Sequence, residues 1–193
     1  MLDKQKDKRF KSDLLRFKYI NKFLKGKEIL DIGSSEGNVH ELLVKRNKDK
    51  KIFSMDSDKD SDFTINLDNP KRINKKFDTV IVGEVIEHLE SPIKFIRYCK
   101  YLLKKGGILI ITTPNAIGLQ YIINPSWCVY YKDYRGHSQA FTIEMLKRIC
   151  EDENFKIVYL DYINAFWINN PLQYVSLIIK RLRPDLIIVA ENK

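Results

Sequence analysis

Three side chains that could bind a cation or move a proton follow one another closely near the middle of the chain. Glu84, Glu87 and His88 are spaced i, i+3 and i+4, so on a helical turn all three would point the same way. Two carboxylates and an imidazole are suitable ligands for a divalent cation, and an imidazole is also a suitable general base. The spacing therefore indicates a site for metal binding or for proton transfer.

A second group of polar residues follows two short apolar runs. Gly33 comes directly after the first run and permits a tight turn, while Gly37 lets backbone or ligand approach closely. Asp56 ends the second run, about 20 residues beyond the glycine turn, at the distance where an acidic residue accepts hydrogen bonds from ribose hydroxyls. Together these residues indicate a ligand that contains adenosine.

The charge of this turn distinguishes between adenosine-containing ligands. A dinucleotide would place its pyrophosphate against the loop, where Glu36 and the nearby Asp31 would repel it. An acidic turn instead favours a ligand that carries positive charge. A sulfonium and an amino group, as in S-adenosylmethionine, fit this requirement.

Alternating strand and helix patterns position both groups. Strands are predicted by the apolar runs at 28–33, 51–56, 77–82 and 107–112, and helices by the periodic patterns at 10–23, 92–103 and 142–150. This alternation predicts parallel strands joined by right-handed crossovers, with ligands bound beyond the carboxyl ends of the strands. Two further runs, 156–160 and 186–190, surround a helical pattern at 172–182 and are expected to form an antiparallel pair.

Composition sets the broad class of the protein. The 193 residues suit a single domain, 1–193, in which residues 1–25 form an N-terminal cap helix. The chain shows no apolar run of membrane-spanning length and no secretory signal, so we expect a cytoplasmic location. Its three cysteines are widely spaced and are expected to be reduced and structural. The net charge of +9 favours anionic partners, although Lys-rich composition also serves solubility.

The motifs, taken in order, resemble those of class I S-adenosylmethionine-dependent methyltransferases from about Lys25 to Phe155. The segments that carry the resemblance are ILDIGSSEG (29–37), Asp56, FDTVIVGEVIEHL (77–89), LLKKGGILIITTPN (102–115) and HSQAFTIEML (137–146). Ubiquinone-biosynthesis O-methyltransferases share the EVIEHL and TPN segments. The resemblance implies a doubly wound α/β fold, with a mostly parallel seven-stranded sheet, helices on both faces and an antiparallel C-terminal strand.

The resemblance also implies roles for individual residues toward S-adenosylmethionine. Asp31, Gly33, Ser34 and Gly37 would hold the methionine end, and Asp56 would hold the ribose hydroxyls. The remaining cofactor contacts come from two later segments. Leu67 and Asp68 would lie near the adenine, and Gly83 and Glu84 near the sulfonium. Ser35 stands where many members of the family have a second glycine.

Segments similar to Glu84, Glu87 and His88 occur in ubiquinone O-methyltransferases and in small-RNA terminal 2′-O-methyltransferases, where the resemblance implies magnesium or manganese. A later histidine accompanies them there, and His137 stands in a comparable place. We therefore expect these four residues to surround an acceptor hydroxyl, either as metal ligands or with His137 or His88 as the catalytic base. In the alternative interpretation, Glu87 and His88 only hydrogen-bond neighbouring backbone.

Aromatic side chains are concentrated between residues 116 and 141, directly after the predicted strand at 107–112. Such side chains can line an apolar pocket while offering hydroxyl groups, so this insertion is predicted to be a substrate lid. The aromatic residues are Tyr121, Trp127, Tyr130, Tyr131, Tyr134 and Phe141.

The methyl acceptor is left open between two classes. A small molecule, such as a phenol, a quinone precursor or a sugar, is the first prediction for the acceptor hydroxyl. The alternative is the 2′-hydroxyl of RNA, which the positive charge favours; the chain has no separate RNA-binding module. A further alternative is a protein that binds S-adenosylmethionine without catalytic activity. The presence of Glu84, Glu87, His88 and His137 argues against it.

Overall fold

The structure is a computed structural model that describes residues 2–34, 38–123, 137–164 and 173–193. The helices are α1 (Leu2–Asn21), α2 (Val39–Arg46), α3 (Pro92–Leu102), α4 (Leu119–Ile123), α5 (Ile143–Asp152) and α6 (Gln173–Ile178), with 3-10 turns η1 (Ile86–His88) and η3 (Lys180–Leu182). The strands are β1 (Glu28–Ile32), β2 (Lys51–Asp56), β3 (Phe63–Thr64), β4 (Phe77–Gly83), β5 (Leu103–Pro114), β6 (Phe155–Ile163) and β7 (Asp185–Asn192).

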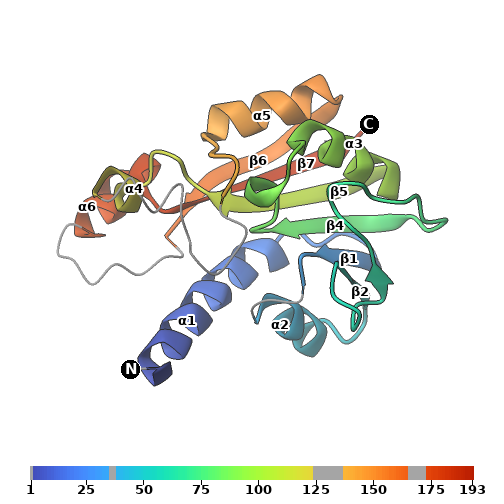
Figure 1. The fold of residues 1–193 in the computed structure, drawn as a ribbon, viewed down its shortest axis with the longest axis horizontal. Coiled ribbons are helices and arrows are strands. Elements are labelled where there is room, and N and C mark those ends of the chain that lie inside the picture. The colour runs from blue at the N-terminus through green and yellow to red at the C-terminus, as the bar shows by residue number, and fades with distance from the viewer. Residues whose placement is uncertain (1, 35–37, 124–136, 165–172) are drawn as a thin grey trace.

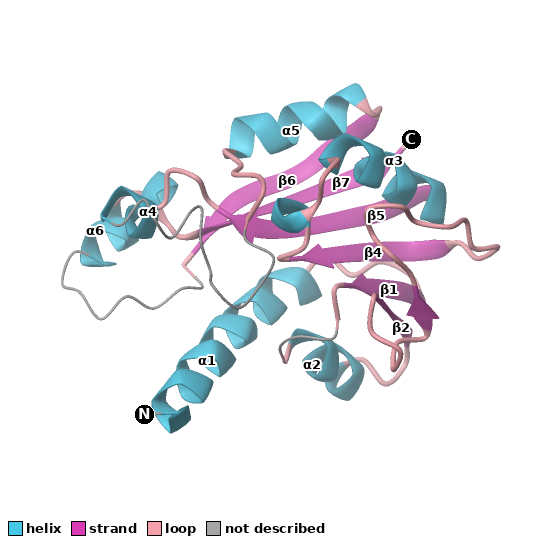
Figure 2. Cartoon of the chain, in the orientation of Figure 1, coloured by secondary structure: helices cyan, strands magenta, loops and turns pink. Residues whose placement is uncertain are grey.

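These strands form one seven-stranded sheet in the order β3-β2-β1-β4-β5-β7-β6 (Figure 2). The pairs from β3 through β5 are parallel, whereas β7 is antiparallel to both β5 and β6. The predicted doubly wound sheet, with its antiparallel C-terminal strand, is confirmed. One difference is that β5 begins at Leu103, four residues before the apolar run at 107–112 that predicted it.

Helices cover both faces of the sheet, as Figure 1 shows with α3 and α5 on one side and α1 and α2 on the other. Each face has its own core, because the central strands are buried on both sides. On the first face, Ile96 of α3 and Leu146 of α5 are fully buried, and on the second face Ile20 of α1 and Leu43 of α2 are fully buried. Among the described side chains of α1, those of its C-terminal half contribute to this core, and Figure 1 shows the start of the helix extending past the sheet.

Local signals explain where two of these helices begin. Pro92 stands in the first turn of α3, where its missing N–H group costs no hydrogen bond. Thr142 caps α5, since its Oγ1 accepts a hydrogen bond from the backbone N–H of Met145 at 3.3 Å. Both helices begin at the carboxyl edge of the sheet, which is the edge where the candidate site lies.

The insertion predicted to be a lid is joined at its base. Asn115 and Phe141 form a parallel bridge, and the N–H of Ala116 donates to the carbonyl of Phe141 at 2.9 Å. The aromatic residues Trp127, Tyr130, Tyr131 and Tyr134 lie outside the described residues, so the lid remains a prediction. Among the helices of the described ranges, none combines the length and apolar character that crossing a bilayer requires.

Candidate functional site

The turn after β1 brings two edge segments into direct contact. Gly33 has a φ of 82°, and its N–H donates to the carbonyl of Met55 at 2.9 Å. A Cβ placed on this residue would lie 2.1 Å from Cγ2 of Val85, which follows β4. Glycine is therefore required here both for the left-handed backbone and for the close approach of the two segments.

Asp31, near the end of β1, is buried, with 4% of its surface exposed. Its Oδ2 lies 3.1 Å from Nδ1 of His40 in α2. Burial raises the pKa of Asp31, the hydrogen bond from His40 opposes this, and the nearby charge of Asp56 adds to it. His40 was not identified from the sequence, because nothing in its spacing shows that α2 packs against the carboxylate of Asp31.

The predicted ribose-binding and adenine-binding residues lie on the neighbouring strand end and loop. Asp56 ends β2 and is 9% exposed, and its Oδ1 accepts a hydrogen bond of 2.6 Å from the N–H of Ser57. Leu67 packs against the core, and Oδ1 of Asp68 accepts from the N–H of Glu90 at 2.9 Å. Ser34 is half-buried in the β1 turn, whereas Gly37 lies outside the described residues.

At the end of β4, Gly83 and Glu84 border the same edge. An added Cβ on Gly83 would meet only Oγ1 of Thr112, at 3.7 Å, so this position has room. Glu84 has a φ of 56°, and its N–H donates to the carbonyl of Thr112 at 3.0 Å. One of its oxygens, Oε1, is buried and has no hydrogen-bond partner within the described part of the chain.

A partly buried arginine from α1, which the sequence did not indicate, connects the parts of this edge. Arg16 donates to the carboxylates of Asp13, Glu84 and Asp185, each at 3.2 Å. Burial acts against the charge of the guanidinium, but the three carboxylates outweigh it and raise its pKa. Oδ2 of Asp13 also accepts from the backbone and side-chain nitrogens of Asn38, at 3.0 and 2.9 Å. Helix α1 thus contacts both the end of the glycine turn and the segment after β4.

Glu87, His88 and His137 form the most compact group of potential ligands. One ligand atom from each lies within 4.8 Å of the others. The two imidazole rings meet edge to face, with centroids 4.9 Å apart, and Oε1 of Glu87 lies 3.8 Å from Nε2 of His88. Hydrogen bonds from the N–H groups of Ser138 and Gln139 to the carbonyl of Glu87, at 2.9 and 3.0 Å, hold His137 beside the turn.

Burial adjusts the proton affinities of this group. Glu87 is 2% exposed, and burial, followed by the charge of Glu84, raises its pKa well above the usual value. Its Oε2 accepts from Oγ1 of Thr113 at 2.9 Å, while Oε1 is buried without a hydrogen-bond partner in the described residues. Burial and the neighbouring His88 lower the pKa of His137. At neutral pH His137 is therefore a neutral imidazole that can accept a proton.

The segment after β4 differs from the single helical turn that the i, i+3, i+4 spacing predicted. Only Ile86–His88 is helical, as a 3-10 turn, and Glu84 precedes it in the left-handed region. The reason is the burial of Val85 and Ile86, which are 8% and 0% exposed and turn the chain sharply into the core. As a result Glu84 extends toward Arg16 and is not a member of the compact group.

A shallow hollow lies beside His137, on the carboxyl side of β5, and among the described residues it leaves no room for a water molecule. The other residues that line it are Pro114, Ala116, Tyr121, Gln139 and Ala140. Tyr121 and Ala116 belong to the predicted lid, so the described part of that insertion borders the compact group. The arrangement gives a neutral imidazole next to an apolar and phenolic surface.

The fold and the residues at this edge indicate the class of protein. A sheet in the order 3-2-1-4-5-7-6, with a glycine turn and paired acidic residues at its carboxyl edge, is the arrangement expected of a class I methyltransferase. The model of the methyltransferase domain family matches residues 2–160. The chain belongs to this family, and the resemblance seen in its motifs is confirmed.

Curated relatives share the family but differ in length. The chain is 32% identical over 118 residues to the mitochondrial ubiquinone biosynthesis O-methyltransferase of Rattus norvegicus, covering 52% of this chain and 34% of that protein. It is 27% identical over 137 residues to the ubiquinone biosynthesis O-methyltransferase of Xanthomonas campestris, covering 58% and 57%. The chain therefore spans between a third and somewhat over half of the length of these relatives.

Solved structures agree with the fold over nearly the whole chain. A methyltransferase from Haloferax volcanii, in complex with the Trm112 methyltransferase activator, has a TM-score of 0.71 at 15% identity, covering 98% of this chain and 92% of that one. A SAM-dependent methyltransferase from Archaeoglobus fulgidus has a TM-score of 0.64 at 21% identity, covering 93% and 92%. At these identities the likeness concerns the fold alone.

Proposed function

We propose that the chain binds S-adenosylmethionine at the carboxyl edge of its sheet and transfers the methyl group to a hydroxyl of a small molecule. The observation that carries this proposal is the contact between the Gly33 turn and the segment after β4, which brings buried carboxylates around one edge. A ligand with a sulfonium and an amino group would gain Coulombic stabilisation there. Family membership supports the same cofactor.

The cofactor contacts follow from this orientation. Asp56 would accept hydrogen bonds from the ribose hydroxyls, and Asp31, Gly33, Ser34 and Gly37 would hold the methionine end. Leu67 and Asp68 would border the adenine, while Gly83 and Glu84 would lie near the sulfonium. Oε1 of Glu84, which is buried and has no hydrogen-bond partner among the described residues, supports the last contact, because a nearby positive charge would compensate for its burial.

Methyl transfer requires an oxygen nucleophile in line with the departing sulfur. The new O–C bond forms as the S–C bond breaks, and the acceptor hydroxyl loses its proton to a base. His137 is the proposed base, because it is neutral, borders the hollow and is held in place through Ser138 and Gln139. His88, whose ring contacts it edge to face, is the second candidate. With His137 as base, kcat/KM should rise with pH below about 6.5 and be level above it.

As the alternative to a histidine base, the compact group fits a divalent cation such as Mn²⁺ or Mg²⁺, because an imidazole that binds a metal cannot accept a proton. The carboxylate suits either ion, whereas the two imidazoles favour Mn²⁺ over Mg²⁺. Oε1 of Glu87 is buried without a hydrogen-bond partner among the described residues, and a cation would compensate for this. Glu87, His88 and His137 would hold the ion, which when bound would lower the pKa of the acceptor hydroxyl. Glu84 is left out of this ligand set, because its Oε2 is paired with Arg16.

Calorimetric titration of S-adenosylmethionine, and of its demethylated product, tests the cofactor. We expect saturable micromolar binding that weakens at least about tenfold in Asp56→Ala, because the ribose hydroxyls lose their acceptor. Asp60→Ala is the matched control, since Asp60 is exposed on the loop that follows the same strand. Absence of binding by either compound would overturn the proposal.

Titration with and without manganese tests the metal separately. We expect a metal-dependent heat that is lost in Glu87→Gln and in His137→Gln. Methyl transfer to a panel of phenols should then fall on chelation and return with manganese or magnesium. Unchanged transfer in excess chelator would remove the metal and leave His137 as the base.

The alternative acceptor, a 2′-hydroxyl of RNA, is favoured by the net charge of +9. The same assay distinguishes the two classes when radiolabelled S-adenosylmethionine is offered with phenols or with short RNA. Label found only in RNA would replace the small-molecule acceptor.

A further inference from the structure

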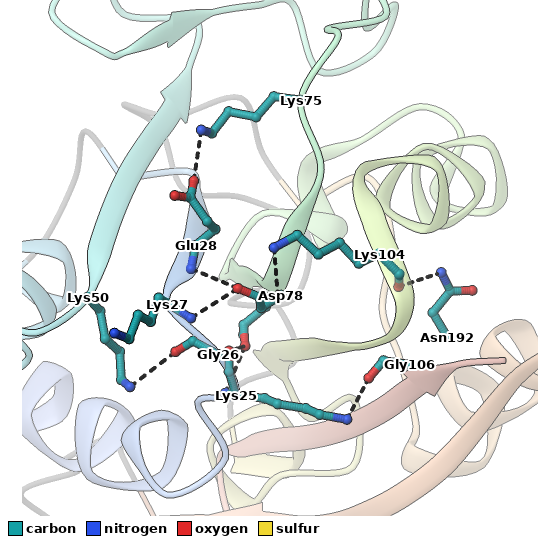
Figure 3. A network of polar contacts seen from close by, with 11 residues as sticks. Lys25, Gly26, Lys27, Glu28, Lys50, Lys75, Asp78, Lys104, Gly106 and Asn192 are labelled. Atoms are coloured by element: carbon teal, nitrogen blue, oxygen red, sulfur yellow. Dashed lines mark hydrogen bonds and ion pairs between the residues drawn. The ribbon is translucent and has the colours of Figure 1, made fainter.

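The edge of the sheet opposite the candidate site carries a row of lysines. The parallel strands β2, β1, β4 and β5 begin at this edge, and each of these four contributes lysines where it starts (Figure 3). Strand β6 joins the row, since its first residue, Phe155, pairs with Asn192 at the far end of β7. The lysines of this amino edge are Lys25, Lys27, Lys50, Lys51, Lys75, Lys76, Lys104, Lys105 and Lys156.

Carboxylates neutralise only part of this charge. The same strand ends contain five of them, Glu28, Asp49, Asp78, Glu153 and Glu191, against nine lysines. Figure 3 shows how two of the five are already engaged. Asp78 accepts from Lys104 at 2.8 Å and from the N–H groups of Lys27 and Glu28, and Glu28 pairs with Lys75 at 2.7 Å. The edge therefore has a clear excess of positive charge.

The strand order arranges the exposed cations in a line. Lys51, Lys27, Lys76, Lys105 and Lys156 are exposed and belong to the starts of β2, β1, β4, β5 and β6. With strands about 4.8 Å apart, the five intervals from β2 to β6 span about 24 Å. A linear row of this length matches a linear polyanion better than a compact anion.

Exposed apolar side chains are missing from the same segments. The exposed large hydrophobic residues of the described chain belong to other parts of the molecule, and none lies in 25–28, 49–51, 75–78, 103–107 or 155–156. Protein interfaces are centred on apolar groups, whereas a phosphodiester backbone is held by cations. The edge thus disfavours a protein partner, and its linear row of cations favours the linear phosphate chain of a nucleic acid over the plane of a lipid surface.

We propose that the amino edge of the sheet binds the phosphate backbone of a nucleic acid through this row of lysines. The row is independent of methyl transfer, because β4 separates it from the candidate site by seven residues, or about 20 Å. A nucleic acid bound at this edge would anchor the protein without placing one of its hydroxyl groups near His137. The interaction would be independent of sequence, since phosphates carry no base information.

Fluorescence anisotropy with a labelled 20-nucleotide single-stranded RNA, measured from 50 to 300 mM salt, tests this proposal. We expect micromolar binding by the wild-type chain that weakens steeply with salt. In the triple variant Lys51→Gln, Lys105→Gln and Lys156→Gln, the dissociation constant should rise about tenfold or more. The slope of log K against log salt should become shallower by about 2, because each phosphate contact contributes about 0.7.

A matched triple variant, Lys59→Gln, Lys94→Gln and Lys180→Gln, removes the same charge from exposed positions outside the row. It should bind RNA nearly as the wild type does, and circular dichroism should show both variants folded. Equal weakening in the two triple variants would overturn the proposal, as would wild-type binding too weak to measure at 50 mM salt. Binding to anionic phosphatidylglycerol vesicles or to an acidic peptide in place of RNA would likewise overturn it. Cofactor binding is measured separately and does not affect this outcome.

Discussion

The two edges of the sheet differ in the burial of their charged side chains. At the carboxyl edge, Asp13, Asp31, Asp56, Glu87 and Asp185 are buried, and Arg16 holds several carboxylates together inside the protein. At the amino edge the charges are lysines on exposed stems, paired in part with half-buried carboxylates. Buried charges must have partners, whereas exposed ones are solvated by water. The carboxyl edge is therefore suited to hold a small ligand, whereas the amino edge presents its charge to the solvent.

Removal of the central cation at each edge should give the largest contrast. Arg16→Met leaves three carboxylates without their partner, so we expect a loss of about 4 kcal/mol in the free energy of unfolding. Lys104→Met breaks an exposed pair with Asp78 and should cost less than about 1 kcal/mol. Urea unfolding at pH 8 measures both. Equal losses would show that the carboxyl edge is as well hydrated as the amino edge.

Two left-handed glycines provide the next test. In Gly33→Ala the new Cβ would lie 2.1 Å from the side chain of Val85, and the alanine would also have to adopt a positive φ. We therefore expect a loss of about 3 kcal/mol in the free energy of unfolding. Gly106, at the amino edge, has a φ of 71°, but an added Cβ would meet nothing closer than 3.9 Å. Gly106→Ala should therefore cost only the backbone term, about 1 kcal/mol. Similar losses, measured by denaturant unfolding, would mean that Val85 can move away.

The third prediction concerns the pH dependence of stability. Burial raises the pKa of Asp185 to about 7 in spite of Arg16. The folded chain then binds a proton between about pH 4 and 7 that the unfolded chain releases, so this residue makes stability fall as pH rises. Relative to Asp185→Asn, the wild type should lose stability across that interval.

Asp78 should show the opposite slope. Burial acts to raise its pKa, but Lys104 and two backbone N–H groups outweigh burial and lower it. Its charge therefore stabilises the fold above about pH 4, and this contribution is lost as pH falls further. Relative to Asp78→Asn, the wild type should lose stability below pH 4. Unfolding curves from pH 3 to 8 for both pairs of proteins check the two signs, and parallel slopes would contradict the contrast between the edges.

Much of the fold was predictable because its signals are local. Apolar runs that end at Gly33 and Asp56 fixed two strands and the edge where ligands bind, and the motif order predicted the family correctly. The spacing of Glu84, Glu87 and His88 predicted a compact group, and the structure brings two of the three together with His137. Glu84 differed because burial of Val85 and Ile86 decides the course of the chain there.

Features that depend on strand order could not be predicted. Arg16 meets Glu84 and Asp185 across 68 and 169 residues of sequence, a distance over which no local pattern carries information. The lysines of the amino edge are dispersed in the sequence. They form a row only when β2, β1, β4, β5 and β6 take their places in the sheet. Charge segregation of this kind is a property of topology, which neither composition nor periodicity specifies.

The place of β7 between β5 and β6 has a consequence for the order of folding. Strand β6 has β7 as its neighbour in the sheet, so it has no strand to pair with until residues 185–192 are available. Until then β5 also presents an open edge that includes Leu109 and Ile110, both fully buried in the finished sheet. Unpaired apolar edges promote association between chains. A nascent or truncated chain that stops before Asp185 would therefore be prone to aggregation, because the sheet closes only after β7 has been synthesised.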